Sequence, residues 1–300
     1  MILMHSIFAL LLAPFLFGLI NRTKAFFGGR RGQPLLQAYY DIFKLLRKGA
    51  VYSRTTTWVF RAGPVVGLAA VLTSLLLLPF GAIPAPLAFD GDLILFAGLL
   101  GLMRFVTVTA ALDTGSAFEG MGASREVQFS ALAEPALLMG LAAVAFLTNS
   151  LSLSGMLSGI SGATWLQAGP ALALVVAGLA IVFLAENARI PVDDPNTHLE
   201  LTMIHEVMVL DHGGPDFAFI LYGSALKMWV LGALLVGILV PNYAGNVWLD
   251  AVIRVASMFS LAVVTGVIES TMARLRLTRV PQLLAGAGVL SALALLLVLR

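Results

Sequence analysis

The sequence contains no cysteine, so disulfides are excluded. Because iron–sulfur clusters are bound mainly by cysteine thiolates, we expect none on this chain. Charge is also scarce, since only 11% of the residues are Asp, Glu, Lys or Arg, against about 25% in a typical soluble domain. With 59% hydrophobic residues and a mean hydropathy of +0.96, the chain cannot cover its surface with polar groups. The composition therefore predicts an integral membrane protein.

The basic residues are clustered and the net charge is only +2, so the pI of 9.1 does not indicate a nucleic-acid partner. We find no internal repeat of the inverted kind that many secondary carriers show, which disfavours a free-standing ion carrier. We also find no soluble second domain. The sequence predicts one all-α membrane domain over residues 1–300.

Eight stretches are long and apolar enough to cross a bilayer as helices of roughly 20 residues. The first lacks a positively charged start, so we interpret it as an uncleaved anchor rather than a signal peptide. The predicted spans are Ile2–Ile20, Trp58–Phe80, Leu93–Leu112, Val127–Leu147, Gly169–Ala188, Phe217–Val240, Val247–Glu269 and Val280–Leu299.

Most Lys and Arg residues lie in or beside alternate loops. Half of the 18 fall at positions 22–61, from the end of the first predicted span to the start of the second. The other basic loops carry Arg125, Arg189, Arg274, Arg276 and Arg279. The loops at 81–92, 148–168 and 241–246 contain no Lys or Arg. Because basic loops face the cytoplasm, we expect the loops that carry Lys and Arg to lie inside and both termini outside. We expect the spans to cross the lipid bilayer of a prokaryotic cytoplasmic membrane.

Residues 33–48, QPLLQAYYDIFKLLRK, form an amphipathic segment. Its apolar side chains recur at helical spacing, and Pro34 suits a first helical turn. At this length and polarity we expect a helix that lies on the cytoplasmic interface. It acts either as an interfacial anchor or as the roof of a pocket that opens towards the cytoplasm.

Several charged residues fall inside predicted spans, where such residues are expensive and usually face a polar interior. Arg104, Glu134 and Lys227 lie well inside the third, fourth and sixth spans. They form either a structural ion pair or part of a proton path, since partly buried acids can have pKa values that approach neutrality. For Arg254, near the outer surface, we expect the side chain to reach out to water.

The loop at residues 186–216 holds seven of the 16 acids and three of the four histidines. Its leucine, methionine and valine residues at steps of three and four predict a helix over Asn196–His212 with one buried face, formed by Leu199, Met203, Val207 and Leu210. Such a pattern argues against a freely solvated loop. The acids are Glu186, Asp193, Asp194, Glu200, Glu206, Asp211 and Asp216.

His198, His205 and His212 are seven residues apart and would share one stripe of that helix. Neighbours at this spacing lie about 10 Å apart, so they cannot chelate one ion without other ligands. The HExxH pattern is absent. We therefore expect no metal here, and expect histidines that relay protons or form hydrogen bonds at a subunit contact.

Three cytoplasmic motifs together resemble a known family. They are the loop AENARIPVDDPNTHLELTMIHEVMVLD, the segment GQPLLQAYYDIFKLL (Gly32–Leu46) and LDTGSAFEGMGASRE (Leu112–Glu126). They are similar to motifs of the membrane subunits of formate hydrogenlyase and hydrogenase-4 and occur in the same order. The pattern of spans resembles that family over essentially the whole chain. These complexes are energy-converting NiFe hydrogenases related to respiratory complex I.

The resemblance implies roles for individual residues. Glu134, in the context Ala-Glu-Pro, resembles the buried glutamate of the family's fourth span. Asn196 and His198 stand where the complex I relative has acids, which puts quinone chemistry in doubt. Together with the charges within spans and in the acidic loop, it leads us to predict proton-path and coupling roles for Glu134, Glu186, Asp193, Glu200, Glu206 and Lys227. We predict structural or docking roles for Arg104, Arg189, Asp41, Lys44, Asp113, Glu119, Arg125, His198 and His205.

The resemblance also implies a non-catalytic subunit that holds no cofactor of its own. It would dock hydrogenase small and large subunits and an iron–sulfur protein, and partner subunits would carry the NiFe centre and the iron–sulfur clusters. Within the membrane it would contact antiporter-like subunits. It would link their redox reaction to proton or sodium movement. The alternatives are the quinone-site subunit of a respiratory NADH dehydrogenase and, less favoured, the ion carrier.

Overall fold

The computed structural model describes residues 3–81, 83–194, 203–242 and 246–300. In these ranges the secondary structure is helical, and eight helices are long and apolar enough to cross a membrane, as the sequence predicted. The long helices are α1 (Met4–Phe27), α3 (Trp58–Leu76), α4 (Asp92–Asp113), α5 (Ala117–Thr148), α7 (Gly162–Glu186), α8 (Gly214–Leu239), α9 (Val247–Thr271) and α10 (Val280–Leu299). Shorter elements are α2 (Gln37–Leu46), α6 (Leu153–Gly159), and the 3-10 turns η1 (Glu206–Val209) and η2 (Leu277–Arg279).

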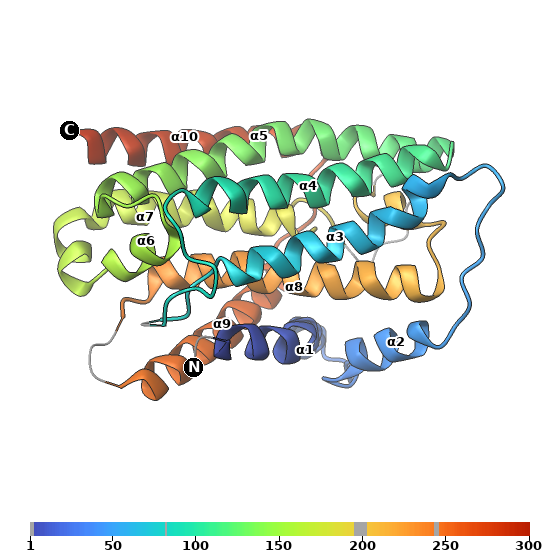
Figure 1. Cartoon of the computed structure of the whole chain (residues 1–300), viewed down its shortest axis with the longest axis horizontal. Helices are drawn as coiled ribbons and strands as arrows, with labels where there is room; N and C mark the ends of the chain where they lie inside the picture. Colours follow the sequence, from blue (N-terminus) through green and yellow to red (C-terminus); the bar gives the residue numbers. More distant parts are fainter. Residues whose placement is uncertain (1–2, 82, 195–202, 243–245) are drawn as a thin grey trace.

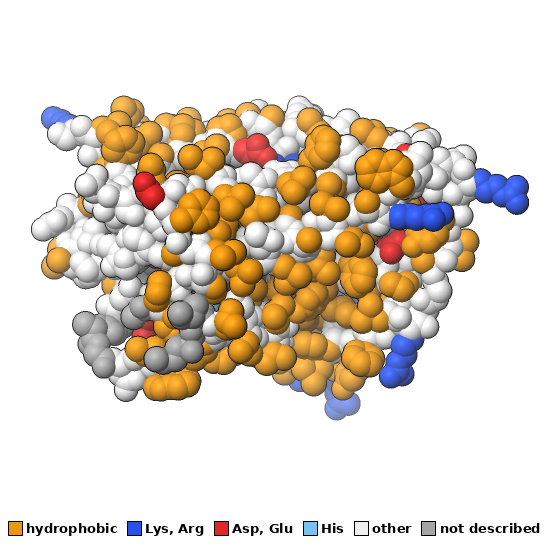
Figure 2. All heavy atoms as spheres, viewed as in Figure 1, with side chains coloured by type: hydrophobic (Ala, Val, Ile, Leu, Met, Phe, Trp, Pro, Cys, Tyr) orange, Lys and Arg blue, Asp and Glu red, His pale blue; other side chains and the backbone are white. Residues whose placement is uncertain are grey.

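Most of the long helices run side by side, while α1 and α9 cross the bundle obliquely (Figure 1). α8 is the central helix and packs against α1, α3, α7 and α9. Its Trp229 is fully buried in the main hydrophobic core. The two termini lie toward the same end of the bundle, which an even number of spans requires (Figure 1). Hydrophobic side chains cover most of the visible face, and Lys and Arg gather mainly at the end where α2 lies (Figure 2).

Several boundaries differ from the prediction. The predicted first span begins at Ile2, which lies outside the described residues, and α1 continues beyond Ile20 to Phe27. The motif 112–126 was expected in a loop, but α4 and α5 take up most of it and only 114–116 connect them. Residues such as Ala117, Met121 and Ala123 favour a helix, and packing against η1 stabilises this extension.

The amphipathic helix is shorter than the predicted segment. Pro34 lies before α2 rather than in its first turn, and its carbonyl accepts a hydrogen bond from the amide of Gln37. The chain here passes very close to α1, because the Leu35 carbonyl lies against Gly18, where any Cβ would clash. α2 then packs against α8 and α1.

A proline in α1 helps to join these three helices. Pro14 has no N–H, so the Leu10 carbonyl loses its helical partner four residues on. The hydroxyl of Tyr222 in α8 donates to that carbonyl at 2.9 Å. The hydroxyl of Tyr39 in α2 donates to the neighbouring carbonyl of Leu11. The α8 side chain thus satisfies a carbonyl that would be costly to leave unpaired in a membrane, and the α2 side chain binds the carbonyl beside it.

The predicted helix over Asn196–His212 is wrong within the described residues. Residues 195–202, which include Leu199, lie outside the described ranges, and from Met203 the chain forms only the 3-10 turn η1. Side chains take the place of helical hydrogen bonds here: Asp193 accepts from the amide of Ile204 at 3.1 Å, and Arg125 donates to the Met203 carbonyl at 2.7 Å. Met203 and Val207 are buried as expected, but Leu210 is half exposed.

Candidate functional site

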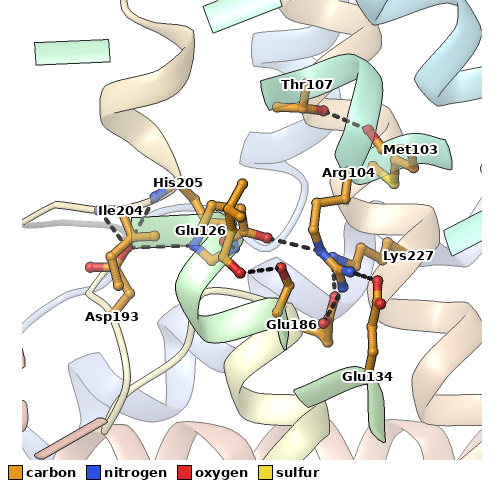
Figure 3. A network of polar contacts seen from close by, with 12 residues as sticks. Met103, Arg104, Thr107, Glu126, Glu134, Glu186, Asp193, Ile204, His205 and Lys227 are labelled. Carbon is orange, nitrogen blue, oxygen red and sulfur yellow. Dashed lines mark hydrogen bonds and ion pairs between the residues drawn. The ribbon is translucent and has the colours of Figure 1, made fainter. Parts of the chain in front are cut away.

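Arg104 of α4 stands at the centre of a charge cluster inside the membrane (Figure 3). Its Nε lies 3.2 Å from Glu126 Oε1, and its two terminal nitrogens contact the carboxylates of Glu134 and Glu186. The guanidinium has five donors in a planar fork, which suits it to several carboxylates at once. One cation thus joins α4, α5 and the end of α7.

Lys227 of α8 extends this cluster. Its Nζ lies 2.7 Å from the second carboxylate oxygen of Glu186, so Glu186 is shared between two cations. The Glu186 side chain is almost fully buried, and that of Lys227 nearly so. A buried carboxylate needs such partners, because the desolvation of an unpaired charge is very costly. The predicted sites Arg104, Glu134, Glu186 and Lys227 therefore meet at one place.

Glu134 differs from the expectation of a buried glutamate. Its side chain is 48% exposed, whereas the Arg104 side chain it contacts is 9% exposed. Glu134 follows Glu126 by eight residues in α5, a spacing that places both on one face of a helix. The cluster thus extends from a buried end at Glu126 to an outer end at Glu134, on the membrane-facing side of the chain.

His205 connects the cluster to the acidic loop. Its Nε2 lies 3.2 Å from Glu126 Oε2 and its Nδ1 lies 3.6 Å from Asp193 Oδ2. Burial acts to lower the pKa of His205, but the charges of Glu126 and Asp193 outweigh burial and raise this pKa above its ordinary value. The protonated imidazolium is therefore favoured between these two acids.

Asp193 organises the loop around His205. Its carboxylate accepts from the amides of Ile204 and His205 at 3.1 and 3.3 Å, and Arg274 donates to it at 2.8 Å. Burial acts to raise the pKa of Asp193, but the hydrogen bond and charge of His205 and the charge of Arg274 hold it below its ordinary value. Asp193 is therefore ionised at neutral pH.

The formal charges of this joined network nearly cancel. The carboxylates of Glu126, Glu134, Glu186 and Asp193 face the three basic side chains Arg104, Lys227 and Arg274. The balance closes when His205 carries a proton. Because the loop and the membrane cluster share this one titratable group, a change of its protonation acts on both.

A second cluster holds the start of the loop. Glu269 of α9 lies 2.8 Å from Lys24 of α1 and 3.3 Å from Arg189, whose guanidinium also stacks over Phe17 at 4.9 Å. Burial lowers the pKa of Arg189, against the effect of the Glu269 charge. These contacts fix Arg189 between two oblique helices.

A cavity of about 430 Å³ lies between the two clusters. Its charged lining includes two further predicted residues, Asp41 of α2 and Glu206 of η1. Asp41 accepts a hydrogen bond from Gln37 at 2.9 Å. Polar side chains such as Asn21 and Thr107 also line it. Much of the remaining lining is apolar and comes from α1, α2, α4 and α8, with Phe17, Ile42, Met103, Phe217, Ile220, Leu221 and Met228. The cavity therefore offers an apolar wall and a charged wall to whatever enters it.

The other predicted residues have local roles. Asp113 accepts from the amides of Thr57 and Phe60 and fixes the start of α3. Glu119 is buried and accepts from the amide of Asp211 at 3.0 Å, which closes the end of the loop. Arg125 bonds the loop backbone at Met203. Lys44 lies exposed on α2, away from the cluster.

Some predictions fall outside this geometry. Glu200 and His198, together with Asn196, lie outside the described residues. His205 and His212 do not share a helical stripe, because only a 3-10 turn separates them, and His212 stacks on Phe60 with ring centroids 3.9 Å apart. Burial lowers the pKa of His212 to about 4. Among the described residues no group of three or more His, Asp or Glu side chains could hold a metal ion.

Sequence reasoning also missed members of the network. Glu126 stood only at the edge of a motif, although its spacing of eight from Glu134 was a usable signal. Arg274 was noted only as a loop charge, and neither Lys24 nor Glu269 of the second cluster was given a role. No spacing along the sequence connects Arg274 with Asp193, which lies 81 residues away.

Arg254 was predicted to reach out to water, and this is wrong. It is only 4% exposed and bonds the carbonyl of Val240 at 3.2 Å, the side chain of Asn242, and Asp250 at 3.5 Å. The reason is a local acid, since Asp250 precedes it by one helical turn. Arg254 therefore pairs with Asp250 within the protein.

Comparisons with known proteins agree with this architecture. A family model described as NADH dehydrogenase matches residues 1–300. Formate hydrogenlyase subunit 4 of Escherichia coli (strain K12) is 32% identical over 293 residues, which are 95% of this chain and 94% of that protein. Hydrogenase-4 component C of the same organism is 30% identical over 279 residues, covering 91% and 87%.

More distant relatives match as well. One of the subunits of the NADH-quinone oxidoreductase of Rubrobacter xylanophilus is 29% identical over 212 residues, which are 69% of this chain and 61% of that protein. A chain in the solved structure of the membrane-bound sulfane sulfur reductase, an archaeal respiratory membrane complex, has the same fold: the TM-score is 0.83 at 20% identity, covering 97% of this chain and 96% of that one. The resemblance inferred from the three motifs is confirmed, and this chain is a multi-pass membrane protein that belongs to the NADH dehydrogenase family.

Proposed function

We propose that this chain is the membrane-anchoring and energy-coupling subunit of a complex I-related, energy-converting NiFe hydrogenase of the formate hydrogenlyase and hydrogenase-4 type. The observation that carries the proposal is the continuous charge network from Asp193 in the loop, through His205 and Glu126, to Arg104 and Glu134. The identity of 32% and 30% to two hydrogenase-branch proteins supports the choice of complex.

The network suggests how coupling works. Redox energy released in a soluble arm moves the loop, which displaces Asp193 and His205 from Glu126. The Arg104 guanidinium then shifts its ion pairs among Glu126, Glu134 and Glu186, because the attraction between the guanidinium and a carboxylate is strong where water is excluded. A change of charge at the outer end, Glu134, biases the movement of a proton or a sodium ion there.

The proposal includes the surroundings of the chain. Cytoplasmic loops dock the hydrogenase large and small subunits and an iron–sulfur protein, which carry the NiFe centre and the clusters. Antiporter-like subunits lie against the chain within a prokaryotic cytoplasmic membrane, with both termini outside. This chain itself catalyses no redox step and binds no cofactor. Glu200, outside the described residues, and Glu206 belong to the same coupling loop.

Purification of the intact complex through a tag on this chain tests the type of complex. We expect hydrogenase large and small subunits to copurify, and hydrogen production or uptake with an artificial electron donor or acceptor. Quinone-dependent NADH oxidation without hydrogen activity would contradict the proposal.

The role of the loop has a separate test. Asp193→Asn keeps the size of the side chain but removes the charge that pairs with Arg274 and His205. We expect the complex to assemble while ion translocation per turnover falls. Translocation at the wild-type ratio would show that the loop acid has no part in coupling.

A second candidate function is that of a quinone-site subunit. The cavity of about 430 Å³, with its apolar and charged walls, favours it, as does the similarity to a protein named for quinone reduction. The NADH–quinone assay separates the two candidates. If the complex reduces quinone, an Ile42→Trp substitution that fills the cavity lowers the rate of that reaction without lowering hydrogen turnover.

A further inference from the structure

The outward face of α2 forms an open groove of about 530 Å³ that is separate from the charged cavity. The rings of Tyr39, Tyr40 and Phe43 line it, together with Lys44 and Arg47. Arg47 lies over the Phe43 ring, with 5.1 Å between the guanidinium carbon and the ring centroid. The groove thus combines an aromatic floor with two cations at its rim.

The two faces of α2 differ in charge. Gln37, Ala38, Asp41 and Ile42 line the charged cavity, while the groove takes the residues one or two positions further on. Asp41 is the one acid in residues 37–48, and it lies on the cavity side. The groove face therefore carries positive charge alone.

The position of the groove matches a bilayer surface. Tyr39, on its floor, bonds the Leu11 carbonyl within the α1 span, so the floor lies beside a membrane-spanning helix. Aromatic rings with nearby Lys and Arg are typical of the interface between acyl chains and headgroups.

From this geometry we infer that the groove on α2 binds an anionic phospholipid. The phosphate lies between Lys44 and Arg47, and an acyl chain lies along Tyr39, Tyr40 and Phe43. Cations near a membrane surface attract anionic headgroups, and an aromatic floor at bilayer depth suits a hydrocarbon chain. A lipid is favoured over a soluble partner because two exposed aromatic rings, Tyr40 and Phe43, lie beside a spanning helix, where they face hydrocarbon rather than water.

Lipid binding to the full chain, purified with its partners and stripped of native lipid, tests this inference. Bound phosphatidylglycerol and phosphatidylcholine with identical acyl chains are counted by native mass spectrometry. We expect phosphatidylglycerol to bind about tenfold more tightly, and Lys44→Gln with Arg47→Gln to lower its affinity about 30-fold. The matched control, Arg30→Gln with Arg54→Gln, removes two exposed cations outside the groove and should change the affinity less than about twofold.

Further arms identify the occupant. Phe43→Ser should weaken both lipids alike, because it removes apolar floor and no charge. Inorganic phosphate that competes as well as the lipid would reduce the groove to a phosphate site and overturn the inference. Equal binding of the two lipids, or wild-type binding by the double variant with an unchanged melting temperature, would also overturn it. So would a photo-crosslinker at position 40 that captures a protein subunit instead of lipid. None of these outcomes bears on the coupling role.

Discussion

The core around His5 in α1 and the loop around His205 each place a histidine among polar partners, and the contrast between the two shows what the network is for. The His5 ring stacks on Phe80 at 4.6 Å, accepts from the Trp229 indole at 3.0 Å, and faces the Leu78 carbonyl at 3.3 Å. Because Nε2 accepts, Nδ1 carries the proton, so this imidazole is neutral with both nitrogens satisfied. His205 instead lies between two carboxylates.

The other polar groups near His5 follow the same local pattern. Asp92 accepts from the Ser152 hydroxyl at 2.8 Å and the Leu153 amide at 2.6 Å, which fixes the start of α6. Arg254 pairs with Asp250 one turn away. Each of these groups has its own local partners. The network around Arg104 shares its partners, so a change at one carboxylate alters the others.

Arg104→Gln should break this contrast most severely. It leaves Glu126, Glu134 and Glu186 without their common cation, and loss of one partner of a buried pair costs about 3–5 kcal/mol. We expect ion translocation in reconstituted vesicles to fall below detection, with a lowered melting temperature. The matched variant is Arg254→Gln, which should destabilise the complex while the assembled fraction still translocates. Equal translocation by the two variants would contradict the distinction.

Glu134→Gln should have a smaller effect, because this side chain is half exposed and Arg104 keeps two other partners. We expect a melting temperature close to wild type and a clear fall in ions moved per turnover. Asp92→Asn, a buried acid outside both the network and the coupling loop, serves as the control and should change stability alone. Wild-type translocation by Glu134→Gln would confine the path to the buried part of the cluster.

The pH dependence of the two histidines sharpens the comparison. Since burial is outweighed by Glu126 and Asp193 and the pKa of His205 is raised, the stability that its proton contributes is fully present below about pH 6.5 and is lost as the pH rises through the raised value. Hydrogen exchange of the backbone amides of Ile204–Val209 should therefore accelerate as the pH rises past the raised pKa of His205. The acceleration should be severalfold larger than the intrinsic pH dependence of amide exchange accounts for. His205→Gln should remove the extra acceleration, whereas His5→Gln should leave it intact.

Trp229→Phe should have the smallest effect on function. It removes the donor to His5 and leaves a buried nitrogen unsatisfied, at a cost of about 1–3 kcal/mol. Thermal unfolding should reveal this loss, while ions moved per turnover stay at the wild-type value. A fall in that ratio would mean that the His5 region also takes part in coupling.

The predictable part of the fold was set by local sequence. Apolar runs identified eight spans, and acids with apolar residues at helical steps identified the loop between α7 and α8 as more than a solvated connector. The loop conformation was not predictable, because Asp193 and Arg125 replace backbone hydrogen bonds with side-chain ones. Glu126 contacts Arg104 because of how α4 and α5 are rotated about their axes and how deep each lies in the membrane. The hydrophobic pattern of α5 does not determine that rotation or depth.

The central claim is that the network transmits redox energy from the loop to the membrane. Its most direct test is the number of ions moved per electron pair in vesicles that contain the Glu186→Gln complex. Glu186 is the carboxylate shared by Arg104 and Lys227. The account predicts that the ratio falls towards zero while electron transfer continues. A wild-type ratio in a fully assembled Glu186→Gln complex would contradict it.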